Sequence, residues 1–97
     1  MYAAIRSAEA VANAAPEIAR RIETSFLPTL SGLPGFRGYY VVTTADDVVT
    51  TISLFDNQAS VDESSRRASA WVAQNLAGLV VSPLHITAGA VAVKQTA

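Results

Sequence analysis

The stretch FRGYYVVTTADDVVTTISLF, residues 36–55, carries the clearest structural signal in the chain. It contains two runs rich in β-branched and aromatic residues, 36–44 and 48–55, separated by Ala-Asp-Asp. Runs of this composition form strands, and aspartates are favoured in tight turns because their side chains bond to the nearby backbone. We therefore predict an antiparallel β-hairpin with Asp46 and Asp47 in its turn.

The first half of this hairpin resembles the aromatic strand of RNA-recognition modules, in which an Arg-Gly pair precedes rings that stack on bases. RNA binding is nevertheless not predicted. In those modules the motif lies on the third strand, whereas here it lies on the second. Tyr40 also occupies a position that must be small, and Val41 occupies one that must be aromatic.

Composition limits both the partners and the chemistry. Charged residues make up 15% of the 97 residues, below the roughly 25% of typical soluble domains, while hydrophobic residues make up 51%. With a net charge of -1 and a sequence pI of about 5.6, the chain offers no basic surface for nucleic acid or an anionic membrane. The absence of cysteine excludes disulfides and thiolate chemistry, and the single histidine leaves no metal-ligand spacing. We predict no metal and no cofactor.

Residues 2–8 are predicted as a first strand. A helix is predicted to start near Asn13, with Pro16 in its first turn, where a missing N–H costs nothing. Pro28 is expected to kink or end this helix. The apolar positions that define it recur at helical spacing: Val11, Ala15, Ile18, Ile22 and Phe26.

A second helix follows the hairpin. Ser60 and Glu63 have the Ser-x-x-Glu spacing of a capping box, and Gly78 and Pro83 are expected to end the helix before a last strand at 86–93. Its buried stripe is predicted to contain Val61, Ser65, Ala68, Val72, Leu76 and Leu79. On the exposed helix faces we predict three ion pairs in the favoured acid-first order: Glu17–Arg21, Asp62–Arg66 and Glu63–Arg67.

The predicted order β-α-β-β-α-β is the ferredoxin-like arrangement, an α+β fold with an antiparallel sheet, in a single domain over residues 1–97. The strands carry apolar residues on both faces: by alternation Phe36 and Tyr40 share one face and Tyr39 the other. Two helices cover only one face of such a sheet. We therefore predict a homodimer in which a second copy covers the other face.

No membrane segment or secretion signal is predicted. Arg6 and Glu9 interrupt the alanine-rich N-terminus before a signal core forms, and Pro83 and His85 interrupt the apolar run at 76–93. A cytoplasmic protein is expected.

Three segments carry a resemblance to a known family: FLPTLSGLPGFRGYYVV, VVTTISLFDNQASVDESSRRASAWVAQNL and ITAGAVAV. Together they resemble the antibiotic-biosynthesis-monooxygenase-like branch of the dimeric α/β-barrel superfamily. Leu-Pro-Gly-Phe entering the second strand, and Phe55 followed by Asn57 and a helix, contribute most of the likeness. The resemblance implies two ferredoxin-like chains packed sheet to sheet as a barrel, with ligand pockets between the sheet and the helices of each subunit.

The catalytic residues of that superfamily do not carry over. The resemblance to its cofactor-free, quinone-forming members assigns their Asn, Trp and Tyr to Thr51, Phe55 and Val61, which lack the required groups. Haem-degrading members use an Asn on the first strand, where this chain has Arg6 and Ser7. They also use a Trp and a His on the second helix, but Trp71 falls about two turns later and His85 lies beyond the helix.

The candidate ligand-binding residues are Arg6, Tyr39, Tyr40, Phe55, Ser64 and Trp71, and the one catalytic candidate is His85, whose side-chain type titrates near neutral pH. Arg6, on a strand of a weakly charged protein, is expected either to pair with a buried carboxylate or to bind an anionic ligand. Trp71 is expected either in the core or in a pocket wall. Tyr39 and Tyr40 must point to opposite faces of the sheet.

Three hypotheses for function follow from the sequence. The first is a homodimeric, monooxygenase-like protein that binds a small apolar or aromatic ligand without the known oxygenase residues. The second is a divergent cofactor-free monooxygenase or isomerase acting on aromatic or polyketide-like substrates. The third is a purely structural assembly module. An open, partly apolar cavity favours the first two, and a solid interior favours the third.

Overall fold

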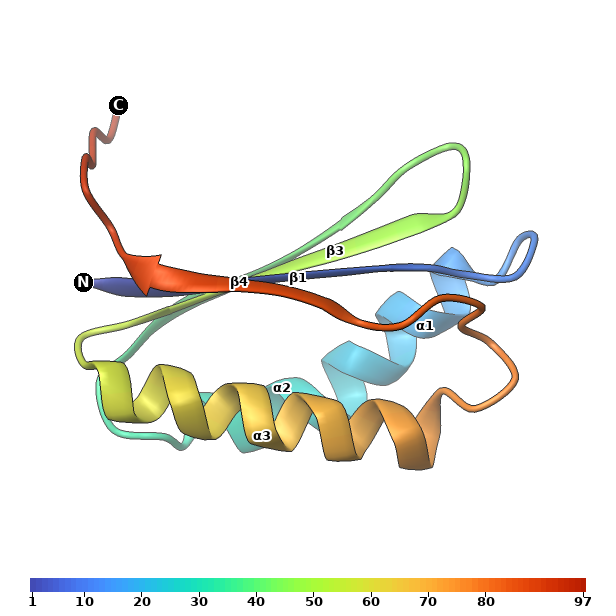
Figure 1. Ribbon diagram of the computed structural model, residues 1–97, viewed down its shortest axis with the longest axis horizontal. Coiled ribbons are helices and arrows are strands. Elements are labelled where there is room, and N and C mark those ends of the chain that lie inside the picture. The colour runs from blue at the N-terminus through green and yellow to red at the C-terminus, as the bar shows by residue number, and fades with distance from the viewer.

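The computed structural model describes all of residues 1–97. Its elements are β1 (Tyr2–Glu9), α1 (Ala15–Arg21), the π-helical turn η1 (Ile22–Phe26), α2 (Leu27–Ser31), β2 (Phe36–Thr43), β3 (Val48–Phe55), α3 (Gln58–Asn75) and β4 (His85–Ala90). The strands form one antiparallel sheet in the order β2-β3-β1-β4. All helical segments lie on one face of it (Figure 1). The predicted ferredoxin-like α+β fold is confirmed.

The predicted hairpin is present between β2 and β3. Tyr40 pairs with Ile52 across it, and Asp47 takes a positive φ of 62° in the turn. A bulge near the start of β2 shifts the register between Phe36 and Gly38. An extra residue in a strand shifts the alternation, so side chains before and after the bulge no longer follow one regular pattern of faces. The expectation that Phe36 shares the face of Tyr40 is therefore wrong, and Phe36 lies on the helix side.

The first helix does not end at Pro28. Instead α1 widens into η1, where the Leu27 N–H donates to the Ile22 carbonyl five residues earlier, and α2 then continues to Ser31. The widened turn directly precedes Pro28, whose ring would crowd the Thr24 carbonyl in a regular α-helix. The proline thus changes the helix geometry rather than terminating the helix.

The start of α3 differs from the prediction. Asn57 is the N-cap, and its side-chain oxygen accepts the Ser60 N–H at 2.8 Å. The Ser60 hydroxyl donates instead to the Pro34 carbonyl at 2.7 Å, which ties the helix to the loop before β2. The capping box predicted at Ser60 is therefore wrong, because an equally good cap stands three residues earlier.

Two of the three predicted ion pairs are present. Glu17–Arg21 is formed at 2.9 Å, and Glu63–Arg67 at 2.8 Å. The predicted partner of Asp62 is wrong: Arg66 pairs with Glu63 at 2.7 Å, so one carboxylate holds two guanidinium groups.

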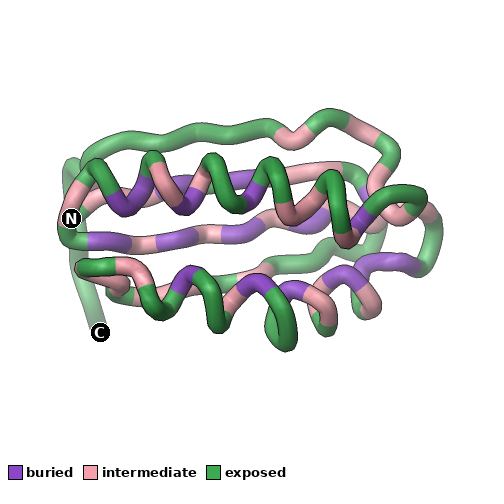
Figure 2. The backbone as a smooth tube through the Cα atoms, turned by 90° about the horizontal axis from the view of Figure 1, so that it is seen from below, coloured by how far each residue is buried: buried purple, intermediate pink, exposed green.

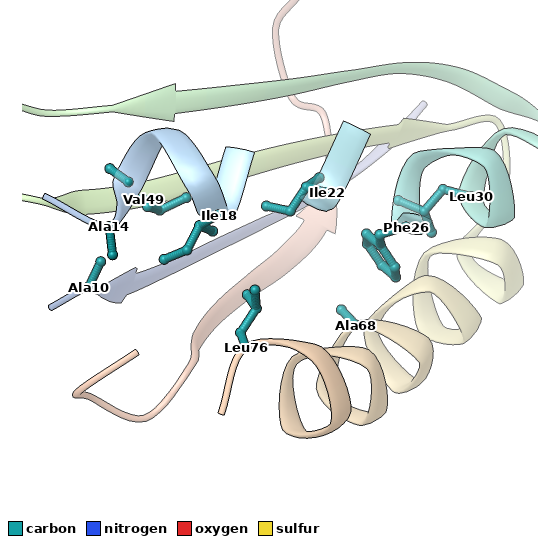
Figure 3. Close-up of a cluster of buried hydrophobic side chains, with 10 residues drawn as sticks. Ala10, Ala14, Ile18, Ile22, Phe26, Leu30, Val49, Ala68 and Leu76 are labelled. Carbon is teal, nitrogen blue, oxygen red and sulfur yellow. The ribbon is translucent and has the colours of Figure 1, made fainter. Parts of the chain in front are cut away.

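The main core lies between the sheet and the helices. Ile18, Phe26 and Leu30 point from the first helical stretch toward Ala68 of α3 and toward the sheet (Figure 3). Within successive turns of the helices buried and exposed stretches alternate, as expected for amphipathic helices that bury one face on a sheet (Figure 2). The last strand, β4, is exposed at every position and ends at Ala90 rather than at residue 93 as predicted.

The other face of the sheet has no helix over it. Ile5, Tyr40 and Val42 are 42%, 58% and 48% exposed there. No helix of the chain combines the length and the hydropathy that crossing a bilayer requires.

Candidate functional site

A cavity of about 40 Å³ lies between the sheet and the helices. Fifteen residues line it, and thirteen of these are hydrophobic. Arg6, Tyr39 and Thr51 contribute from β1, β2 and β3, while Phe26 and Trp71 contribute from η1 and α3. This is the layer in which the sequence resemblance implied a ligand pocket.

Aromatic rings occupy much of the space around the cavity. Phe26 stands between Trp71, with ring centroids 5.3 Å apart, and Tyr39, at 6.3 Å. The indole N–H of Trp71 donates to the Ser25 hydroxyl at 2.9 Å. The remaining volume of about 40 Å³ is far below the roughly 300–1,000 Å³ of a pocket for a drug-sized ligand. A flat ligand therefore requires the Phe26 ring to move.

Arg6 is the polar centre of the site. Its side chain rises from β1 and is only 2% exposed. It donates from Nη1 to the Ser53 hydroxyl of β3 at 2.7 Å and from Nη2 to the Ser64 hydroxyl of α3 at 2.6 Å, with a longer contact of 3.3 Å to Ser65. Its Nε–H is buried and has no hydrogen-bond partner.

No carboxylate balances the charge of Arg6. Each of the other five arginines pairs with an acidic side chain within 3 Å: Arg20 and Arg21 with Glu17, Arg37 with Asp56, and Arg66 and Arg67 with Glu63. Those arginines are all at least partly exposed, whereas the one fully buried arginine contacts only neutral hydroxyls. Of the two roles predicted for Arg6, pairing with a buried carboxylate is absent from the chain.

Two pKa shifts describe the electrostatics. Burial lowers the pKa of the Arg6 guanidinium, and the neighbouring Tyr39 partly opposes this, but a guanidinium stays protonated throughout the physiological range. Burial raises the pKa of the Tyr39 phenol, and Thr51 and the Arg6 charge only partly offset the rise. At neutral pH the site therefore holds one positive charge and a neutral phenol.

The structure brings together four of the residues predicted for the site. Arg6, Tyr39 and Trp71 line the cavity, and Ser64 is the buried acceptor behind Arg6. Strand alternation would have indicated Thr51 and Ser53 on this face as well. Phe26 carried no sequence signal beyond its place in the helical stripe.

The other three predicted residues lie elsewhere. Tyr40 is on the open face of the sheet because it follows Tyr39 in the strand. Phe55 is fully buried in a separate cluster with Ala4 and Val61, and Phe36 packs on it with ring centroids 5.7 Å apart. His85, exposed at the start of β4, does not line the cavity.

No three His, Asp or Glu side chains gather as they would around a metal ion.

No protein-family model matches the chain, and no curated protein matches it. Solved structures do. A putative antibiotic biosynthesis monooxygenase from Nitrosomonas europaea aligns with a TM-score of 0.76 at 11% identity, over 96% of this chain and 100% of that chain.

Two further structures were solved with ligands. A MhuD mutant with two manganese protoporphyrin IX molecules per active site aligns with a TM-score of 0.75 at 18% identity, over 100% of both chains. The ActVA-Orf6 monooxygenase of Streptomyces coelicolor, in complex with nanaomycin D, aligns with a TM-score of 0.73 at 14% identity, over 98% of this chain and 92% of that chain. The chain therefore has the fold of antibiotic-biosynthesis-monooxygenase-like proteins, as the sequence resemblance predicted.

Proposed function

We propose that this protein binds a small, flat, apolar ligand in the cavity between its sheet and its helices. The observation that carries the proposal is the lining: thirteen hydrophobic residues of fifteen, with the rings of Phe26, Tyr39 and Trp71 on the walls. Cavities with an apolar lining and few polar groups are the usual binding sites for small molecules. Proteins of the same fold bind manganese protoporphyrin IX and nanaomycin D, which supports ligand binding by a chain of this fold.

The ligand must displace side chains to enter. Phe26 is the last residue of η1, a π-helical turn, and such turns recur at functional sites because they break the regular hydrogen-bond ladder of the helix. Ser25, which accepts the Trp71 N–H, is in the same turn. Moving Phe26 away from Trp71 thus requires a change in one short turn and leaves the sheet intact.

Trp71 is the only tryptophan, so its emission reports on the cavity directly. Titration with flat aromatic compounds is expected to change this emission saturably. Ala68 is 3% exposed and lines the cavity, so Ala68→Leu should fill it and weaken binding at least tenfold, at a stability cost of about 1–3 kcal/mol. Ala70→Leu, on the exposed side of the same helix, is the matched control and should bind normally.

Two results would overturn this proposal. In the first, no compound of a broad aromatic panel changes the emission of Trp71. The other is equal binding by the Ala68→Leu and wild-type proteins, since that would put the bound compound outside the cavity.

We also propose that the open face of the sheet is the interface of a homodimer. Ile5 of β1 pairs with Ile52 of β3, which in turn pairs with Tyr40 of β2, so an apolar strip crosses three adjacent strands. Tyr40 is 58% exposed in the isolated chain, and an exposed apolar strip of this kind usually marks an interaction surface. A second copy offers the same strip, and an isologous contact between the two would bury on the order of 1,600 Å².

Sedimentation equilibrium at micromolar concentration tests the dimer. The wild type is expected to run at twice the 10.2 kDa of the chain. Ile52→Lys places a charge at the centre of the strip and should give the monomer, whereas Ala73→Lys on the exposed side of α3 should not. A wild-type protein that runs as a 10.2 kDa species would refute the proposed interface.

A further inference from the structure

We infer that the ligand of this cavity carries one negatively charged oxygen group, a carboxylate or the phenolate or enolate of a ring, and that this group binds Arg6. The inference rests on the proposed function, because it assigns the chemical class of the ligand in the same cavity. Arg6 differs from the other arginines of the chain, because each of those pairs with an acidic side chain.

The charge of Arg6 is hydrogen-bonded but not compensated. The Ser53 and Ser64 hydroxyls accept from Nη1 and Nη2 and bring no net charge. The Nε–H is buried without an acceptor, so the guanidinium retains unused donor capacity. Tyr39, the only other titratable side chain lining the cavity, is a neutral phenol at neutral pH. Folding has already removed water from this guanidinium, so an anionic partner gains its attraction to Arg6 without a further cost of dehydrating it.

A purely structural role does not require this charge. Elsewhere the helices pack on the sheet through apolar side chains such as Ile18, Leu30 and Val49. A neutral side chain at position 6 could bridge β1 and α3 without the desolvation of an ion. An arginine held between serines is instead suited to planar recognition of a carboxylate-like group, since its donors lie in one plane.

The distribution of polar groups indicates a ligand with a single acidic end. The polar lining groups are the Arg6 guanidinium, the Thr51 hydroxyl and the Tyr39 phenol, from β1, β3 and β2, so all of them are at the sheet side of the cavity. Two of them, Arg6 and Thr51, are direct neighbours across their strands. The helix side contributes only apolar and aromatic groups such as Phe26, Val72 and Leu76. The ligand class is therefore an aromatic or polycyclic monoanion, its acidic oxygen on the sheet and its apolar body toward the helices.

Matched acids and amides test the inference. The probes are 2-naphthoic acid and 9-anthracenecarboxylic acid. Each is compared with its primary amide, which has nearly the same shape and no charge. Affinities are measured by Trp71 emission and by calorimetry at neutral pH. The wild type is expected to bind each acid at least tenfold more tightly than the amide. Arg6→Met, of similar length but uncharged, should lose this preference, and Arg37→Met, which removes an exposed paired arginine, should keep it.

The outcomes separate this inference from the function it rests on. Equal binding of acid and amide to the wild type overturns the role of Arg6 and leaves ligand binding intact. A preference for the acid that survives in Arg6→Met also overturns it. Binding of none of the four probes counts against the cavity as a ligand site altogether. The comparison of acid with amide in the wild type is decisive even where Arg6→Met does not fold.

Discussion

Replacing Arg6 with methionine is expected to change the stability of the unliganded protein by no more than about 1 kcal/mol. Two terms oppose each other. Burying a guanidinium costs several kcal/mol of hydration. The hydrogen bonds from Nη1 to Ser53, at 2.7 Å, and from Nη2 to Ser64, at 2.6 Å, each return about 1.5–3 kcal/mol because the donor is charged. The sum is close to zero.

Arg6→Met removes both the hydration cost of the guanidinium and its hydrogen bonds to the two serines. One smaller cost remains, from a serine hydroxyl that loses its donor. The Ser64 hydroxyl keeps a partner because it also donates to the Val61 carbonyl at 2.7 Å. The Ser53 hydroxyl, fully buried, loses the donor that Arg6 supplied. The double variant Arg6→Met/Ser53→Ala removes this unpaired hydroxyl and is expected to be about 1 kcal/mol more stable than Arg6→Met alone.

Urea denaturation of each variant, followed by circular dichroism, measures these differences, and an unchanged m-value checks that the unfolding reaction is the same. Leu30→Ala serves as a reference for a side chain that stabilises the fold: Leu30 is 0% exposed, and its truncation should cost about 2–5 kcal/mol. A loss of about 3 kcal/mol or more in Arg6→Met would equal the loss from breaking a buried ion pair. That result would contradict the expected balance of the two terms, because it would make Arg6 a structural residue.

Three further predictions concern other parts of the fold. Asn57→Ala should lower the free energy of unfolding by about 1 kcal/mol, since it removes the cap of α3, and urea denaturation would detect this; an unchanged midpoint would contradict the assigned cap. Hydrogen bonds from Arg20 and then Arg21 lower the pKa of Glu17 from 4.5 to about 2, so its contribution to stability is complete above pH 4.5 and is lost as the pH falls toward 2. Stability measured across this range should depend less on pH in Glu17→Gln, and identical profiles would argue against the pairing. Phe55→Leu should destabilise the protein by on the order of 1–3 kcal/mol while leaving the Trp71 titration unchanged, because Phe55 is core outside the cavity; weakened ligand binding in a folded variant would count against that placement.

Local composition and periodicity were enough to predict the helices, the strands and the apolar residues on both faces of the sheet. Composition and hydrophobic period are local properties of consecutive residues, so they predicted the hairpin at 36–55 and both helical stretches. The same period places Tyr39 and Tyr40 on opposite faces, and they lie so in the structure. The bulge that turns Phe36 inward escaped prediction, because one extra residue in a strand leaves no mark on composition.

The surroundings of Arg6 depend on long-range packing. Ser53 and Ser64 lie 47 and 58 residues away in the chain, and both reach the guanidinium because of the register of β1 on β3 and the position of α3 over the sheet. The sequence indicated that Arg6 needed a partner and left two kinds open. It could not exclude a buried carboxylate, since that depends on where every acidic side chain lies after folding. In the folded chain the carboxylates of Glu17, Asp56 and Glu63 pair with exposed arginines. Arg6 therefore remains a buried charge without a counter-charge.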